Sequence, residues 1–448
     1  METEQRQYEF SGFRLDVISR ELFGPGGASI PLTSRAIDVL VYLIEQRDRV
    51  VTKDDLLTTV WSGRVVEENN LAQAISTLRK AFAVDVGDYR HIVTIPGRGY
   101  RFVAELAAGS FTERRRAPGT TEPLAAAERL YLAGRDLNDA PSLSRCKRAI
   151  GVFRQVLDID PRYARAWSGQ AFAWRSLTIT GDMDPKQAFP LAKAAVQHAF
   201  ALNPNLPEAH AEHGFNLFWI DWNWRGAELA CKRAISLDPR IPEGHFVYAH
   251  LLNNLGRFGE ALAQMRQARE LDPLSPLINA LEGSFLAAAG RPQEASVRIE
   301  QALEIAPDFW IALLARAGMV TALGDPAAAV TILEHAAKLS ERSSQVLAVL
   351  AQALVATGNR AGAEQLREEL RALAETAFVP GACRAAISNA LGDLEEALDL
   401  LELAFEQRDV RMTFLKTDAR WNNLRSQPRF EALMDRMGFT AGPARGVL

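Results

Sequence analysis

This 448-residue sequence is poor in cysteine and in long stretches without charge. Its three cysteines lie far apart and without metal-ligand spacing (Cys146, Cys231 and Cys383), which indicates reduced thiols and neither a metal site nor a disulfide framework. The longest uncharged stretch lies between Arg342 and Arg360 and contains serine, glutamine and asparagine, so it is too short and too polar to cross a membrane. The first residues do not resemble a signal peptide. We therefore expect a cytoplasmic protein that does not contact a membrane.

The sequence also lacks the short motifs of common catalytic sites. It has no phosphate-binding Gly-x-x-x-x-Gly-Lys, no dinucleotide-binding Gly-x-Gly-x-x-Gly after a strand, and no Gly-x-Ser-x-Gly of serine hydrolases. We therefore expect neither an enzyme nor a bound cofactor.

Acidic residues are missing from one segment, residues 69–84, which contains no aspartate or glutamate. With 3.6 residues per turn, the apolar residues of this segment fall on one stripe that should face a core: Leu71, Ile75, Leu78 and Phe82. The opposite side collects hydrogen-bonding groups, with Arg79 on its flank: Asn69, Gln73, Ser76, Thr77 and Lys80. Amides and hydroxyls read base edges in a major groove, and a surface facing phosphates excludes carboxylates. An ordinary amphipathic helix with a solvated polar face would fit this segment equally well.

The next segment predicts a β-hairpin. Residues 91–103 contain two short β runs around Pro96–Gly99, whose glycines permit a tight turn. A helix followed by a basic-tipped hairpin is the layout of a winged helix. Upstream, Thr33 or Ser34 can cap one helix and the capping box Thr52–Asp55 can open a second. Residues 8–32 predict four short strands at 8–10, 13–15, 21–23 and 30–32.

Together these segments resemble the OmpR/PhoB/ToxR-type winged-helix DNA-binding domain. The matching pieces are Leu32–Leu40, Val50–Leu57, Val60–Trp61, Ile75–Lys80 and Gly97–Phe102. The resemblance implies a four-stranded N-terminal sheet, three helices and a C-terminal wing, with the helix around Asn70–Lys80 in the major groove and Arg79, Tyr100 and Trp61 near phosphates. Family members often carry arginine or histidine where this chain has Ala74, Ser76 and Thr77, and Pro96 replaces a base-contacting arginine of some relatives, which leaves Arg98 for the minor groove. The expected DNA-binding set is Trp61, Asn69, Asn70, Gln73, Ser76, Thr77, Arg79, Lys80, Thr94, Arg98 and Tyr100.

The expected DNA-binding domain is not basic as a whole. Residues 1–106 contain 13 Lys and Arg against 15 Asp and Glu, whereas residues 69–103 contain five against two. DNA binding should therefore depend on a local patch and weaken strongly with salt.

Most of the remaining sequence repeats with a regular period. Similar phrases end at Pro161, Pro204, Pro239, Pro273 and Pro307, with separations of 43, 35, 34 and 34 residues. Small residues recur 12 and 5 positions before each proline, and nine of these ten are alanine: Ala149, Val156, Ala192, Ala199, Ala227, Ala234, Ala261, Ala268, Ala295 and Ala302. Further units appear at 329–336 and 391–406, and 428–437 should form a closing helix. This pattern resembles the tetratricopeptide repeat, in which two helices cross closely.

Such repeats stack into a superhelix whose concave face binds a peptide or another protein. Phe215, Phe218, Asn253 and Asn254 are candidate partner-binding positions on that face. The nine extra residues near 177–185 should form a longer loop.

Three groups in the repeats allow either a functional or a packing role. His210 and His213 could hold a metal, but they fall on packing positions of the repeat, so we expect no metal site. Trp219, Trp222 and Trp224 could form an aromatic cage or fill a joint between helices. Cys231 could sense redox state or pack as an inert thiol.

We therefore expect a mainly α protein: a winged helix-turn-helix domain (α+β) at 1–106, a flexible linker at 107–122 and a tetratricopeptide α-solenoid at 123–448. The linker arginines 114–116 could contact phosphates or only keep the linker solvated. The resemblance implies a bacterial transcriptional regulator that binds double-stranded DNA, RNA polymerase, and a protein or effector held by the repeats. No phosphoacceptor domain fits before Tyr8, so signals should enter through the repeats. The alternative is a repeat scaffold whose N-terminal domain mediates protein contacts.

Overall fold

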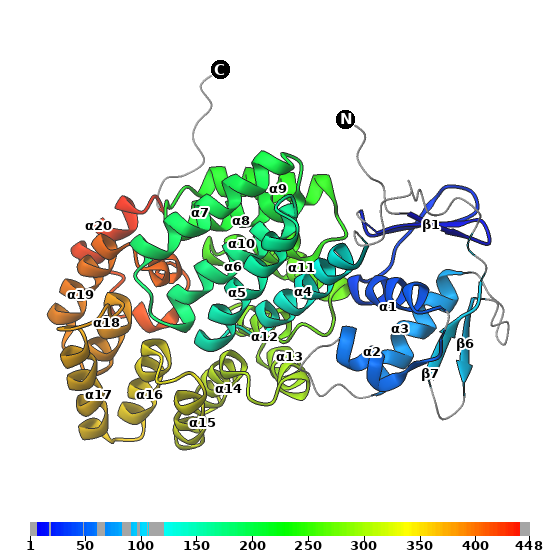
Figure 1. The fold of residues 1–448 in the computed structure, drawn as a ribbon. Helices are drawn as coiled ribbons and strands as arrows, with labels where there is room; N and C mark the ends of the chain where they lie inside the picture. Colours follow the sequence, from blue (N-terminus) through cyan, green and yellow to red (C-terminus); the bar gives the residue numbers. More distant parts are fainter. Residues whose placement is uncertain are drawn as a thin grey trace. The chain divides into compact units, whose positions relative to one another are not determined.

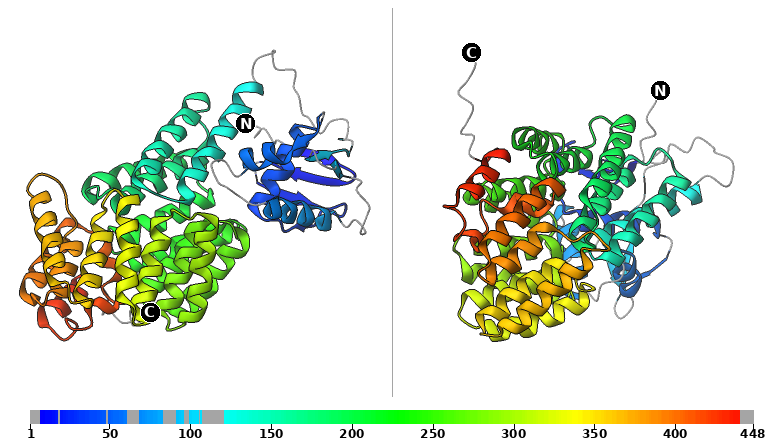
Figure 2. Two further views of the ribbon diagram at one scale, coloured as in Figure 1. Left: turned by 90° about the horizontal axis from the view of Figure 1, so that it is seen from below. Right: turned by 90° about the vertical axis from the view of Figure 1, so that its left-hand side faces the viewer.

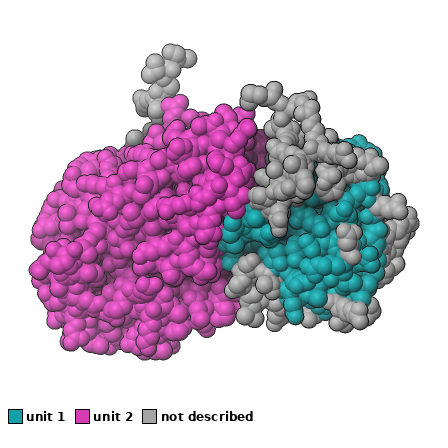
Figure 3. Space-filling view, viewed as in Figure 1, with its two compact units in different colours: residues 1–136, 270–272 teal, residues 137–269, 273–448 magenta. Residues whose placement is uncertain are grey.

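The computed structural model describes residues 7–17, 19–47, 49–60, 68–82, 91–95, 99–104, 106 and 121–439. The chain forms two compact units (Figures 1 and 3): Met1–Asp136 with Glu270–Asp272, and Leu137–Arg269 with Pro273–Leu448. The first unit extends beyond the boundary at 106 that the sequence suggested, because it includes most of helix α4 (Thr121–Asp139). The greater part of the expected linker, residues 107–120, lies outside the described residues.

The first unit begins with a four-stranded antiparallel sheet in the order β1-β2-β3-β4. Its strands confirm the expected positions within a residue or two: β1 (Gln7–Phe10), β2 (Phe13–Asp16), β3 (Glu21–Phe23) and β4 (Ser29–Ile30). Three helices follow, namely α1 (Ser34–Glu45), α2 (Lys53–Val60) and α3 (Glu68–Ala81), and then the hairpin of β6 (Ile92–Ile95) and β7 (Gly99–Phe102).

Local signals explain where the first two helices start. The Thr33 hydroxyl accepts from the Ala36 amide at 3.2 Å, so Thr33 rather than Ser34 caps α1. In the predicted capping box, the Asp55 amide donates to the Thr52 hydroxyl at 2.9 Å and the Thr52 amide donates to the Asp55 carboxylate at 3.3 Å. Both caps satisfy amides that the first turn of a helix leaves without partners.

One strand was not predicted. Residues Val51–Thr52 form β5, which pairs with β7 and completes a three-stranded sheet in the order β5-β7-β6. This pairing brings the hairpin against the segment that precedes α2. It places β7, with Tyr100 at its centre, in the middle of the sheet.

The second unit is a stack of helix pairs (Figure 2). Its helices are α5 (Leu143–Ile159), α6 (Ala164–Thr180), α7 (Pro185–Leu202), α8 (Pro207–Trp219), α9 (Trp224–Leu237), α10 (Pro242–Asn254), α11 (Phe258–Leu271), α12 (Pro276–Ala288), α13 (Pro292–Ile305), α14 (Trp310–Ala322), α15 (Pro326–Leu339), α16 (Ser344–Ala356), α17 (Arg360–Leu373), α18 (Gly381–Ala390) and α19 (Leu394–Gln407). Two 3-10 turns, η1 (Val410–Phe414) and η2 (Ala419–Trp421), lead to the predicted closing helix α20 (Pro428–Arg436).

The repeat register expected from the sequence is confirmed. All ten small residues at the two recurring positions are completely buried, at 0% exposure, where paired helices cross. A second regularity appears six residues after three of the prolines. There, the side chains of His210, His245 and Asn279 each lie within 3.0 Å of the carbonyl of Pro204, Pro239 and Pro273, respectively. These bonds fix the turn that begins each new helix pair.

The nine-residue insertion is not a longer loop, which corrects the expectation from the sequence. Helices α6 and α7 contain 17 and 18 residues, whereas α8 and α9 contain 13 and 14. The extra residues therefore lengthen both helices of one pair. Asp182 in the turn between them has a positive φ of 46°, and its side chain reaches other parts of the unit.

Candidate DNA-binding surface

Helix α3 has the two faces that the sequence predicts. Its apolar stripe is buried together with Ala74, and no member of the stripe exceeds 4% exposure: Leu71, Ile75, Leu78 and the following Phe82. Gln73, Ser76 and Lys80 are exposed, and Thr77 and Arg79 are half-buried. The core therefore fixes the rotation of α3 about its axis, and the exposed side presents amide, hydroxyl and ammonium groups.

The hydroxyl of Thr77 is committed within the helix. It donates to the Gln73 carbonyl at 2.9 Å, one turn earlier. Thr77 therefore presents an acceptor oxygen and a methyl group to a ligand, and its hydroxyl proton is not available. The exposed donors on the described part of this face are the Gln73 amide, the Ser76 hydroxyl and the Lys80 ammonium group.

Arg79 joins α3 to the hairpin. Its guanidinium donates to the Ile92 carbonyl at 2.9 Å and to the Thr94 hydroxyl at 2.8 Å, both on β6. Because arginine donates in a planar fork, this contact sets the angle between helix and hairpin as well as their distance. In the described structure Arg79 and the exposed Thr94 therefore position α3 relative to the hairpin.

A buried charged cluster joins α1 to the end of α2 and to the preceding sheet. This cluster was not predicted from the sequence. Arg35 of α1 donates to the Val60 carbonyl at the end of α2 at 2.7 Å, and Asp38 pairs with Arg20 from the preceding sheet. Burial alone would raise the pKa of Asp38, but the nearby Arg20, Arg135 and Arg35 hold it below its usual range. The available signal was a charged pair at positions i and i+3 inside an otherwise apolar helix.

Several of the expected DNA-contacting residues are either outside the described residues or buried. Trp61 and Arg98 lie outside the described residues, as do the side chains of Asn69 and Asn70 on the first turns of α3. Tyr100 is only 7% exposed, because its strand lies in the middle of the three-stranded sheet. Most of its side chain therefore packs in the domain, and its expected contact with phosphates stays a prediction.

The expectation that the four candidate partner-binding residues of the repeats lie on an open face is also corrected. Phe215, Phe218, Asn253 and Asn254 are buried, with exposures of 1, 0, 5 and 0%. The sequence placed them on an open concave face. In the structure that face is covered by other parts of the same unit, so these residues lie in a core.

The remaining candidates in the repeats pack against neighbouring side chains. Trp219 and Trp222 are buried, and the indole nitrogen of Trp224 donates to the Met437 carbonyl at 2.7 Å, so the tryptophans fill a joint. The histidine pair lies against Phe200, and within the described ranges no three His, Cys, Asp or Glu side chains gather in a metal-binding arrangement. All three cysteines are buried, and burial raises the pKa of Cys146 to about 11 and that of Cys383 to about 12.

Comparisons with known proteins agree with both units. Residues 27–102 match the family described as transcriptional regulatory protein, C terminal, and residues 242–267 and 344–369 match the tetratricopeptide repeat. The protein thus carries an OmpR/PhoB-type winged-helix DNA-binding domain followed by tetratricopeptide repeats.

The curated relatives share a domain-sized stretch. Transcriptional activator CadC of Escherichia coli is 33% identical over 81 residues, which are 18% of this chain and 16% of CadC. Transcriptional regulator HilA of Salmonella typhi is 34% identical over 97 residues, or 22% of this chain and 17% of HilA. The cholera toxin transcriptional activator of Vibrio cholerae is 32% identical over 98 residues, or 21% of this chain and 33% of that protein. The chain therefore spans a third or less of the length of each.

A solved structure resembles the fold more broadly. The Cut9-Hcn1 hetero-tetramer of the APC/C superposes with a TM-score of 0.50 at 14% identity, covering 72% of this chain and 57% of that chain. This likeness supports the repeat fold alone. Over the described ranges, no helix has both the length and the apolar character needed to cross a membrane.

Proposed function

We propose that this protein is a transcriptional regulator that reads DNA with helix α3 in the major groove and receives a protein partner through its repeats. The observation that carries the proposal is the pairing of a fully buried apolar face on α3 with an exposed face whose described side chains, from Gln73 to Lys80, include no carboxylate. Arg79 fixes that helix to the wing strand, so the polar groups are held in one orientation before DNA arrives. Pre-organisation of this kind reduces the entropy lost on binding.

Within this proposal, Gln73 is a base-reading residue. Replacing Gln73 with alanine should cost about 1–3 kcal/mol at the cognate site and relax the preference for that site, because the amide can bond two atoms of a base edge. Because Gln73 is exposed, the change should leave the fold intact. Titrations against cognate and random duplexes at one salt concentration provide the measurement. Equal losses on both duplexes would contradict the assignment.

Lys80 serves as the contrasting case, because an ammonium group binds phosphate as a point charge without sequence preference. Lys80→Ala should weaken cognate and random DNA by similar factors. It should also reduce the slope of log affinity against log salt by about one unit, as expected when one phosphate contact is lost. The check is a salt titration of the wild type, Lys80→Ala and Gln73→Ala, in which only the lysine variant should change the slope. A sequence-dependent loss with an unchanged slope would place Lys80 on a base.

The decisive experiment for the function as a whole is selection of bound fragments from a genomic DNA library by the purified protein. Enrichment of one sequence pattern, with affinity that falls with salt, is the expected result. Absence of enrichment and of binding at low salt would favour a repeat scaffold whose N-terminal domain contacts proteins. A partner on the repeats would regulate DNA binding by its differential affinity for two arrangements of the chain, typically about 1–3 kcal/mol.

A further inference from the structure

The C-terminal segment, residues 408–439, contacts helices that lie far away in the sequence. In a repeat array each unit is expected to touch only its neighbours. Here Arg408 donates to the Ile220 carbonyl across 188 positions, and Arg411 donates to the Thr178 carbonyl across 233 positions. Trp224 donates to the Met437 carbonyl across 213 positions. The segment therefore joins the last repeats to the first ones.

Arg411 is the centre of this contact. Its guanidinium lies 3.1 Å from the carboxylate of Asp182 and 3.3 Å from that of Asp409, and Arg411 and Asp409 are 9% and 0% exposed. The other oxygen of Asp409 accepts from the Ala382 amide of α18 at 3.0 Å. One ionic cluster thus links the lengthened α6–α7 pair, the C-terminal segment and α18. Because both charges lose water on burial, this joint depends on all partners being present.

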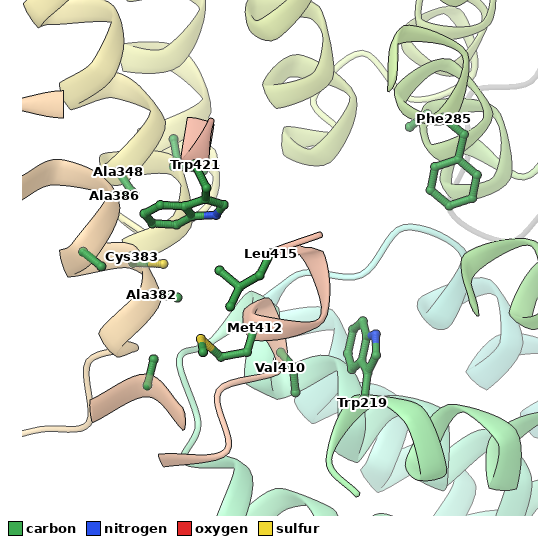
Figure 4. Packing of buried hydrophobic residues seen from close by; sticks show 14 of the residues in the cluster. Trp219, Phe285, Ala348, Ala382, Cys383, Ala386, Val410, Met412, Leu415 and Trp421 are labelled. Atoms are coloured by element: carbon green, nitrogen blue, oxygen red, sulfur yellow. The ribbon is translucent and has the colours of Figure 1, made fainter. Parts of the chain in front are cut away.

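The apolar side chains next to Arg411 fill the space between opposite walls of the repeats. Figure 4 shows Met412 beside Ala382 and Cys383 of α18, with Val410 on the side towards Trp219 of α8. The ring of Phe414 lies 5.8 Å from that of His250 on α10. Val410, Met412 and Leu415 are completely buried, at 0% exposure. These residues therefore occupy the inner face of the array as a short peptide would.

Helix α10 shows that the inner face is covered. Twelve of its thirteen residues are buried, although a repeat helix on an open concave face would expose one side. Yet the face retains unused hydrogen-bonding capacity. Within the described residues, neither the Asn216 and Asn254 amides nor the His250 ring nitrogens have a hydrogen-bond partner, and all three side chains are more than nine-tenths buried. Side-chain amides and imidazoles can hydrogen-bond the backbone N–H and C=O groups of a bound peptide. The 3-10 turn η1 uses part of its own backbone groups within the turn, so it offers fewer of them than an extended peptide would.

We propose that residues 408–424 are an intramolecular ligand of a peptide-binding groove on the inner face of the repeats. The external partner is a protein segment of the same chemistry, with an arginine that pairs with Asp182 and apolar side chains beside it. Such a segment would bind by displacing residues 408–424. The polar joint suits an exchangeable contact, because the carboxylate of Asp182 stays with the repeats and can receive a competing arginine. This device depends only on the repeats, so it can fail without affecting DNA recognition.

Cys383 provides the readout for release. It lies beside Met412, and burial keeps its thiol protonated, whereas Cys231 is buried between α8 and α9 and Cys146 between α5 and α6. In the full-length chain, Arg411→Ala should accelerate alkylation of Cys383 at least tenfold and leave Cys231 and Cys146 protected, as measured by peptide mass spectrometry. Asp182→Asn removes the other partner of the same ion pair, so it should also accelerate alkylation of Cys383. Arg425→Ala is the matched control, because the bonds of Arg425 to described residues are local, to Asn422 and Asp418.

Rescue in trans tests the groove itself. A synthetic peptide of residues 408–424, added to the Arg411→Ala protein, should restore protection of Cys383, and the same peptide with alanine at position 411 should not. Equal acceleration at all three cysteines would mean that the array unfolds. No acceleration at Cys383, or no rescue, would mean that the segment is a permanent cap. Each of these outcomes overturns the proposal, while DNA binding of the same samples reports separately on the proposed function.

Discussion

Replacing Gly99 with alanine should disrupt the DNA-binding domain while the repeats remain folded. Gly99 opens β7 with a φ of +148°, which L-residues rarely adopt, and a Cβ there would lie 2.0 Å from the Val51 carbonyl oxygen and 2.8 Å from the Thr52 Cα. Both neighbours are backbone atoms of β5, so the strand pair must separate. The strained backbone and the clash together should cost about 3 kcal/mol or more, a large share of the stability of a small domain.

Gly27→Ala is the matched control for Gly99→Ala. Gly27 also has a positive φ, of +75°, but a Cβ at this position would meet nothing within 4 Å. It should therefore cost only about 1 kcal/mol, from the backbone conformation alone. Hydrogen exchange of peptides from residues 7–103 and 143–439, together with a DNA shift assay, separates the two units. Retained DNA binding and protection in Gly99→Ala would show that β5 and β7 do not need to pair.

The features predicted correctly from the sequence are those set by neighbouring residues. The burial of Leu71 and Leu78 follows from helical spacing, and the capping box at Thr52 depends on residues three positions apart. The alanine register of the repeats could be predicted because every pair repeats the same crossing. On α3, spacing alone therefore predicted which side chains are exposed.

The features missed from the sequence depend on distant partners. The contact of Arg35 with the Val60 carbonyl joins residues 25 positions apart, and β5 is a strand only because β7 pairs with it. Phe215 and Asn254 have the spacing of residues on a concave face, but they are buried. The return of the C-terminal segment to the first repeats also joins distant residues, such as Arg411 and Thr178. Periodicity describes one repeat and its neighbours, so it cannot reveal that an array closes on itself.

Replacing Gly381 with alanine should destabilise the repeats, because two repeat helices cross closely at this residue. A Cβ on this first residue of α18 would lie 2.8 Å from the Ala404 amide nitrogen and the Leu400 carbonyl oxygen of α19. Because these are backbone atoms of a packed helix, they cannot move aside as a flexible side chain would. Gly381→Ala should therefore force α18 and α19 apart and destabilise the array by about 3 kcal/mol.

Gly318→Ala should change stability in the opposite direction. Gly318 lies inside α14, is exposed, and has nothing within 4 Å of the position of a Cβ. Alanine there removes backbone freedom from the unfolded chain without a clash, so it should stabilise by up to about 1 kcal/mol. Urea denaturation of the repeats, followed by tryptophan fluorescence, measures both variants against the wild type. If Gly381→Ala proved as stable as Gly318→Ala, the helices would not approach each other closely enough to require glycine, and packing at this pair would have to be looser than the structure shows.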